Sequence, residues 1–288
     1  MVKAVNQGAS TSARETLPRQ LTRRADLSRT IHNRRFCHKI DSMIRFLSTA
    51  FAALLALPIA SAETVQLAAT DGVKVFGEVW RAASTKPPII VAFHQAESSG
   101  AEYAPIAPRL VRAGFTVLAI DQRSGDGAFG GTNRTAAALG RKATYEEALP
   151  DLEAALAWAK ANSYGAPVVV WGSSYSAALV FLLAARHPSD VNGVVAFSPG
   201  EYLGNKTAVR DAARKVEVPV YIDQASGADE IRQSAAILQA VKSADKQQLL
   251  SRLKSTHGSS TLRADANPAG AEAHWMAVLK FLKRFTPA

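Results

Sequence analysis

The sequence predicts an α/β protein with a mostly parallel central sheet and helices on both faces of that sheet. Two features of residues 63–288 indicate this class. Short apolar runs alternate with longer amphipathic stretches, the order expected for strands that are each followed by a helix. Several of the short runs are apolar at every position and rich in β-branched residues, as in strands buried on both faces of a parallel sheet.

The expected sheet begins with an antiparallel hairpin. Residues 64–68 and 73–80 alternate in polarity on either side of an Asp71-Gly72 turn. Continuous apolar runs then predict a series of buried strands, over 88–93, 115–120, 166–171, 194–197 and 218–222. We expect residues 247–253 to add a last strand at the edge of the sheet.

The intervening stretches have helical periodicity or the composition of loops. Apolar residues at helical spacing predict helices over 103–113, 146–161, from the end of the 166–171 strand to about Arg186, and over 270–284. Gly114 is expected to end the first of these helices. Residues 122–144 are rich in Gly and Ala, and we expect them to form a long loop.

The first 62 residues are predicted to be an N-terminal extension followed by an export signal. Arg45 supplies a positive charge before twelve largely apolar residues, 46–57, and the segment ends in Ala60-Ser61-Ala62, a small-x-small cleavage pattern. The apolar run is shorter than the roughly 20 residues that span a bilayer. We therefore expect cleavage after Ala62, with Met43 as the true start.

The expected mature protein, residues 63–288, is a single exported domain, periplasmic or secreted, with no stable membrane anchor. Its composition argues against nucleic-acid binding, because basic and acidic residues nearly balance there, 24 against 21, whereas residues 1–62 carry 10 against 3. The only cysteine of the chain, Cys37, lies in the extension. The domain would thus contain no disulfide, thiolate nucleophile or cysteine-based metal site.

The strongest local motif is a strand, a sharp turn and a helix over residues 168–178. The turn reads Gly172-Ser173-Ser174-Tyr175-Ser176, with almost no loop between the apolar strand and the helix. Such a nucleophile elbow holds a serine at a strained corner where only small neighbours fit, above a helix N-terminus that favours negative charge. Ser174 is therefore the predicted nucleophile.

This elbow resembles that of the α/β-hydrolase superfamily, whose usual form is Gly-x-Ser-x-Gly. Ser176 departs from that form in the last small position. The resemblance implies a catalytic triad in the order serine, acid, histidine, on an α/β-hydrolase fold.

His257 is the predicted general base. It follows the last expected strand in Thr256-His257-Gly258, at the carboxyl ends of the strands where such sheets bind ligands. In the superfamily the base lies in this loop, often as His-Gly. His187, at a helix end, and His274, within the closing helix, fit structural roles better.

The resemblance places the acid in the loop after the 218–222 strand, often as an Asp-Glu pair. Asp229 is therefore the predicted acid, with Asp223 as its rival and Glu230 as a lesser alternative. A role for Asp229 as the N-cap of the helix that begins there would be compatible with its role as the acid.

The oxyanion hole is expected to use the backbone N–H of Tyr175 and one N–H from the loop after the 88–93 strand. That loop reads His94-Gln95-Ala96, where the superfamily often has His-Gly-x, so Ala96 is the first candidate and Gln95 the second. We expect His94 to be a structural residue of this loop, and it is also a candidate for the substrate loop together with Arg123 and Arg134.

Several basic residues follow the 115–120 strand in what would be a substrate loop. Arg123 is expected to brace the loops around the site by pairing and hydrogen bonding. Arg134, Arg141 and Lys142 could meet an anionic substrate, although a charge cluster of this size is more often simply solvated.

About twenty residues separate the 194–197 and 218–222 strands, too few for a separate lid domain. The layout is similar to the dienelactone hydrolase-like branch of the superfamily, with a serine in place of the cysteine of its name-giving enzymes. The resemblance implies a carboxylesterase that acts on small to medium esters or lactones through an acyl-enzyme, without metal or organic cofactor. The alternatives are a serine peptidase of the same fold and a non-catalytic binding protein; the sequence leaves the oligomeric state open.

Overall fold

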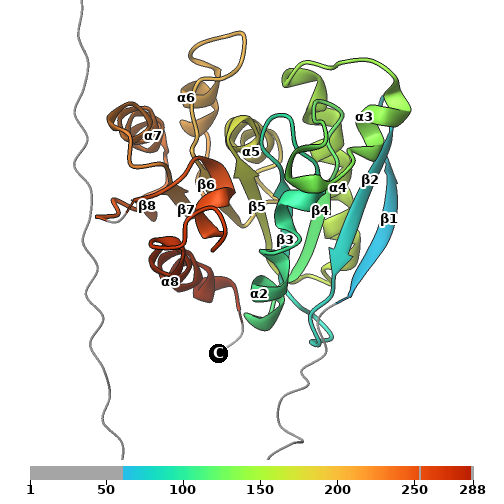
Figure 1. Cartoon of the computed structure of the whole chain (residues 1–288), viewed down its shortest axis with the longest axis horizontal. Coiled ribbons are helices and arrows are strands. Elements are labelled where there is room, and N and C mark those ends of the chain that lie inside the picture. Colours follow the sequence, from blue (N-terminus) through green and yellow to red (C-terminus); the bar gives the residue numbers. More distant parts are fainter. Residues whose placement is uncertain (1–60, 253, 287–288) are drawn as a thin grey trace, which may run out of the picture. The chain divides into compact units, whose positions relative to one another are not determined.

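The computed structural model describes residues 61–252 and 254–286, and these form an eight-stranded sheet (Figure 1). The strands are β1 (Ala62–Ala68), β2 (Lys74–Trp80), β3 (Ile89–Phe93), β4 (Thr116–Ile120), β5 (Val168–Ser173), β6 (Gly193–Phe197), β7 (Val220–Asp223) and β8 (Lys246–Gln248). Their order across the sheet is β1-β2-β4-β3-β5-β6-β7-β8. β1 pairs antiparallel with β2, and β2 with β4, whereas all other neighbours are parallel.

Helices cover both faces of this sheet and bury two apolar cores (Figure 1). The helices are α2 (Ala107–Arg112), α3 (Arg134–Leu139), α4 (Leu149–Asn162), α5 (Tyr175–Arg186), α6 (Ala208–Ala213), α7 (Ala228–Ala240) and α8 (Ala271–Leu282). Single 3-10 turns are η1 (Gly100–Tyr103), η2 (Ala128–Gly130), η3 (Glu146–Ala148), η4 (Gly258–Leu262) and η5 (Lys283–Phe285).

The two cores follow from the alternation of side chains along the strands. Val170 of β5 packs in the core formed with α4, α5, α6 and α7, whereas its neighbour Trp171 packs in the core formed with α2 and α8. Because both faces are covered, the parallel strands are apolar at successive positions, which confirms the predicted fold class.

The structure differs from the predicted elements in three places. The helix expected over 103–113 begins at Ala107, which puts Pro108 in the first turn, where a missing N–H breaks no helical bond. The expected 122–144 loop contains α3, capped by the Asn133 side chain, which accepts a hydrogen bond from the Ala136 N–H at 2.8 Å. The last strand is shorter than expected and ends at Gln248.

The predicted export signal lies almost entirely outside the described residues, since only Ser61 and Ala62 of it are described. Cleavage after Ala62, the start at Met43 and the domain boundary therefore stay predictions. In the described part of the chain, none of the helices is long and apolar enough to cross a bilayer.

Candidate active site

The nucleophile elbow forms where the sequence predicts it. β5 ends at Ser173 and α5 begins at Tyr175, so Ser174 alone makes the turn, with φ +58° and ψ −122°. Such a backbone conformation is strained for a residue with a side chain and is typical of functional sites. Gly172 permits the turn, since a Cβ there would lie 2.3 Å from the carbonyl oxygen of Ser176.

The serine that departs from the usual elbow pattern acts as a cross-link. The buried Ser176 hydroxyl donates to the carbonyl oxygen of His94 at 2.5 Å and accepts from Nε2 of Gln122 at 2.6 Å. These bonds tie the first turn of α5 to the segments that follow β3 and β4. Ser176 therefore fits the crowded corner and adds a contact that glycine does not provide.

His257 lies between Ser174 and a carboxylate. Its Nε2 is 2.7 Å from Oγ of Ser174, and its Nδ1 is 2.8 Å from Oε1 of Glu230. A carboxylate can only accept hydrogen bonds, so Nδ1 carries the proton and Nε2 is left to accept the serine hydroxyl. This is the geometry that a general base needs to activate a serine nucleophile.

Asp229, the predicted acid, does not contact His257 in the structure, so this prediction is wrong. The Asp229 side chain is 81% exposed and forms an ion pair with Arg232. α7 begins at Ala228, so Glu230 occupies the third helical position and turns back toward the preceding loop, where it also accepts the Ala225 N–H at 3.1 Å. The lesser alternative is thus the one that reaches His257.

The rival acid, Asp223, pairs with His274 and not with His257. It ends β7 as a fully buried residue, and its Oδ2 is 2.7 Å from Nδ1 of His274 in α8. The pair joins β7 of the sheet to α8, and it leaves His274 in the structural role that the sequence predicts.

The surroundings of Glu230 keep it ionised. Partial burial would raise its pKa, but the hydrogen bonds from His257 and Ser198 outweigh this effect and hold the pKa of Glu230 below its usual value. The Ser198 hydroxyl oxygen also accepts the Gly258 N–H at 2.9 Å. Ser198 therefore connects the acid to the residue that follows the histidine.

The structure shows which of the candidate oxyanion donors have a backbone N–H that is free to donate. Tyr175 is the first residue of α5, where backbone N–H groups have no acceptor within the helix. The N–H of Gln95 donates to Oε2 of Glu102 at 2.7 Å and is not available, which corrects that alternative. The Ala96 N–H has no hydrogen-bond partner among residues 61–252 and 254–286, so it remains the candidate second donor beside Tyr175.

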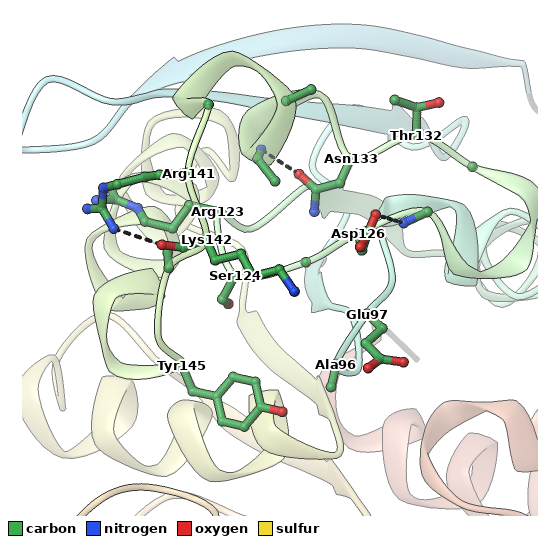
Figure 2. Close-up of a pocket in the computed structure, with 17 residues that line it drawn as sticks. Ala96, Glu97, Arg123, Ser124, Asp126, Thr132, Asn133, Arg141, Lys142 and Tyr145 are labelled. Atoms are coloured by element: carbon green, nitrogen blue, oxygen red, sulfur yellow. Dashed lines mark hydrogen bonds between the residues drawn. The ribbon is translucent and has the colours of Figure 1, made fainter.

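Residues that follow β3 and β4 line a cavity of about 630 Å³, and Ser174, Tyr175 and His257 are not among its lining residues (Figure 2). Ala96 and Tyr145 lie at one end of it, and the Lys142 side chain reaches into its middle. The Tyr145 ring stacks on the ring of Tyr175 with centroids 4.2 Å apart, and Ser124 Oγ lies 2.8 Å from the Tyr175 hydroxyl. Two residues that line the cavity thus hold Tyr175, which directly follows Ser174. The volume of the cavity suits a small organic molecule.

Arg123 and Arg134 are engaged in ion pairs. The buried Arg123 pairs with Asp151 of α4 at 2.6 Å and with Asp71 of the β1–β2 turn, and so braces the loops as expected. Arg134 pairs with Asp121 at 2.8 Å and does not line the cavity of Figure 2. The structure therefore gives Arg134 no place in that cavity.

His94 is a structural residue. Its Nδ1–H donates to the carbonyl oxygen of Gln95 at 2.7 Å, and its Nε2 accepts the Gln122 N–H at 3.0 Å. Burial lowers the pKa of His94 to about 4, so the ring is neutral and both nitrogens are used.

Sequence reasoning missed Ser198, Glu102 and Tyr145, which contact the site residues from other segments. Ser198 directly follows β6 and has φ +55°, so the end of that strand is a signal that could have drawn attention to it. Glu102 and Tyr145 carry no local signal, because their roles depend on contacts with residues far away in the sequence.

A mostly parallel sheet covered on both faces, with a strand–serine–helix elbow and a histidine loop at its carboxyl edge, defines the α/β-hydrolase fold. A family model described as "Dienelactone hydrolase family" matches residues 77–286, and the chain belongs to this family. A search of curated protein sequences finds no match.

Solved structures of esterases and a dienelactone hydrolase share the fold. Dienelactone hydrolase from Anabaena variabilis matches with a TM-score of 0.62 at 16% identity, covering 80% of this chain and 100% of that chain. The Pyrococcus furiosus esterase Pf2001 matches with a TM-score of 0.59 at 18% identity, covering 79% and 94%. Est1E from Butyrivibrio proteoclasticus matches with a TM-score of 0.58 at 17% identity, covering 78% and 98%.

Proposed function

We propose that this protein is a serine carboxylesterase that acts through an acyl-enzyme. The observation that carries the proposal is the continuous hydrogen-bonded chain from Ser174 through His257 to Glu230. Membership in the dienelactone hydrolase family supports hydrolase chemistry, and the serine at the elbow makes an oxygen nucleophile the reacting group.

The reaction proceeds in two halves. Ser174 Oγ attacks the ester carbonyl while its proton passes to Nε2 of His257, and Glu230 stabilises the imidazolium that forms. The backbone N–H groups of Tyr175 and Ala96 stabilise the oxyanion, each typically contributing about 10²- to 10³-fold in rate. His257 then gives its proton to the leaving alkoxide and afterwards activates the water that releases the acid product.

The cavity of Figure 2 is the proposed substrate site, and small to medium esters or lactones are the proposed substrates. Its volume falls within the range of small-molecule sites, about 300–1,000 Å³. The segment between β6 and β7 contains only the short helix α6, so the site remains open to varied substrates. We further propose that the domain is exported, on the strength of the leader sequence alone.

The purified chain should hydrolyse p-nitrophenyl esters and leave the matching p-nitroanilides intact. We expect this because the nitrophenolate of an ester is a much better leaving group than the nitroanilide of the matching amide. A series from acetyl to octanoyl esters, with release of nitrophenol or nitroaniline as the readout, measures both the bond preference and the acyl length.

Either of two outcomes would contradict this proposal. Cleavage of the anilides at rates comparable to the esters would favour a peptidase. No turnover of either series by folded protein would favour a binding protein of the same fold.

A further inference from the structure

A second carboxyl group lies buried beside the proposed active site. Glu102 of η1 has no exposed surface. Among the described residues, no Lys, Arg or His nitrogen lies within 4.0 Å of its carboxylate to form an ion pair. Burying an unpaired carboxylate is costly, so its position requires an explanation.

Glu102 connects three separate segments of the site. Its Oε2 accepts the N–H of Gln95 at 2.7 Å, in the loop that carries the Ala96 oxyanion donor. Its Oε1 accepts the hydroxyl of Ser173 at 2.7 Å, the residue directly before the nucleophile. The same Ser173 oxygen accepts the N–H of Ser259 at 2.9 Å, in the turn that follows the histidine loop.

The ionised form of Glu102 matches these contacts better than the neutral form. Both oxygens face donors, an amide N–H and a hydroxyl, and a carboxylate accepts from both. A protonated Glu102 would present an O–H to one of them, so one hydrogen bond would have to be lost or the Ser173 hydroxyl would have to turn away.

The groups that face Glu102 act in opposite directions on its ionisation. Burial raises the pKa of Glu102 to about 7, although the hydrogen bonds from Gln95 and Ser173 and the charges of Arg263 and His257 favour the anion. Near neutral pH both forms are therefore populated.

We propose that ionised Glu102 is a positioning residue. It holds the loop after β3, which carries Ala96, and the loop that carries His257 in their places beside Ser174. This inference rests on the proposed serine esterase mechanism. It assigns to Glu102 no contact with the substrate, and it makes protonation of Glu102 a second way, besides protonation of His257, to switch the site off at low pH.

The stability of the fold provides a separate readout. In the unfolded chain Glu102 titrates near its usual value of 4.5, and in the folded chain near 7. Between these values the folded state binds more protons, so this group lowers the free energy of unfolding as the pH rises through that window. Glu102→Gln removes this cost, and a residue that served folding alone would not be expected to improve the fold when replaced.

The test is the rate of fluorophosphonate labelling of the full chain from pH 5 to 9, for wild type, Glu102→Gln and the control Glu272→Gln. Glu272 is a surface glutamate of α8, 67% exposed and paired with Arg109. We expect Glu102→Gln to react about 10- to 100-fold more slowly at pH 8, since small misplacements of reacting groups have effects of this size. Its midpoint of thermal unfolding at pH 8 should equal or exceed that of the wild type.

The shape of the pH profile decides between positioning and a general effect. The logarithm of the wild-type rate should fall on the acid side more steeply than that of Glu102→Gln, by up to one per pH unit, because only the wild type protonates Glu102 there. Glu272→Gln should behave as wild type. Two outcomes would overturn the positioning role alone. One is that wild type and Glu102→Gln have equal rates and equal slopes. The other is that Glu102→Gln reacts more slowly but with an unchanged slope and a lower unfolding midpoint than the wild type. Absence of labelling in the folded wild type would instead overturn the proposed function on which this inference rests.

Discussion

Replacing His257 by Ala is expected to lower kcat for ester hydrolysis by roughly 10⁴- to 10⁶-fold, the range found when a triad histidine is lost. A serine hydroxyl is a poor nucleophile until a base removes its proton. Nε2 of His257 lies 2.7 Å from Ser174 Oγ, in position to accept that proton. Steady-state kinetics on a p-nitrophenyl ester measure the effect.

His187→Ala is the matched control for this prediction. His187 ends α5, is one third exposed and lies 3.5 Å from Glu153 on the surface. The same substitution there should leave kcat within a few-fold of the wild type. A loss of activity at His187, or full activity without His257, would refute the assignment of the base.

The second large effect is expected at Glu230 and not at its neighbour Asp229. Glu230→Gln should lower kcat by roughly 10³- to 10⁴-fold, because an amide neither fixes the correct tautomer of His257 nor stabilises its protonated form. KM should change little, since Glu230 contacts the histidine. The kinetics of the two single variants on one ester substrate test this difference.

Asp229→Asn removes a charge one residue away and serves as the control. Its side chain is 81% exposed and pairs only with Arg232 among the described residues, so we expect activity close to that of the wild type. The reverse pattern, an inactive Asp229→Asn and an active Glu230→Gln, would restore the acid that the sequence predicts and contradict the arrangement in the structure.

The positions of Ser174 and His257 were predictable because their signals are local. A buried strand that runs into a helix through Gly-x-Ser leaves one position for a strained serine, Ser174. His257 is marked by its place after the last strand, where the carboxyl ends of parallel strands meet. The parallel sheet itself was predictable because strands buried on both faces are apolar throughout.

The carboxylate that reaches His257 was mispredicted because the choice depends on where a helix begins. In Gly227-Ala228-Asp229-Glu230, a shift of one residue in the start of α7 exchanges which carboxylate faces the loop and which faces solvent. Helix boundaries are the least certain feature of a sequence-based prediction. Asp223, at the end of β7, contacts His274 instead of His257, and no local pattern predicts this contact because His274 lies 51 positions away.

The supporting contacts could not be predicted from local pattern. The sequence ranks Ala96 only just before Gln95 as a donor, and the bond from the Gln95 N–H to Glu102 is the contact that separates them. Glu102 meets Ser173 across 71 residues, and Gly258 meets Ser198 across 60. Such contacts follow from the packing of the whole fold.

The central claim is that Ser174 is an activated nucleophile, and intact-mass spectrometry after fluorophosphonate treatment tests it most directly. The wild-type protein should gain the mass of one adduct, and folded Ser174→Ala should gain none. Failure of the folded wild type to gain an adduct, or an equal adduct on Ser174→Ala, would contradict the serine hydrolase mechanism.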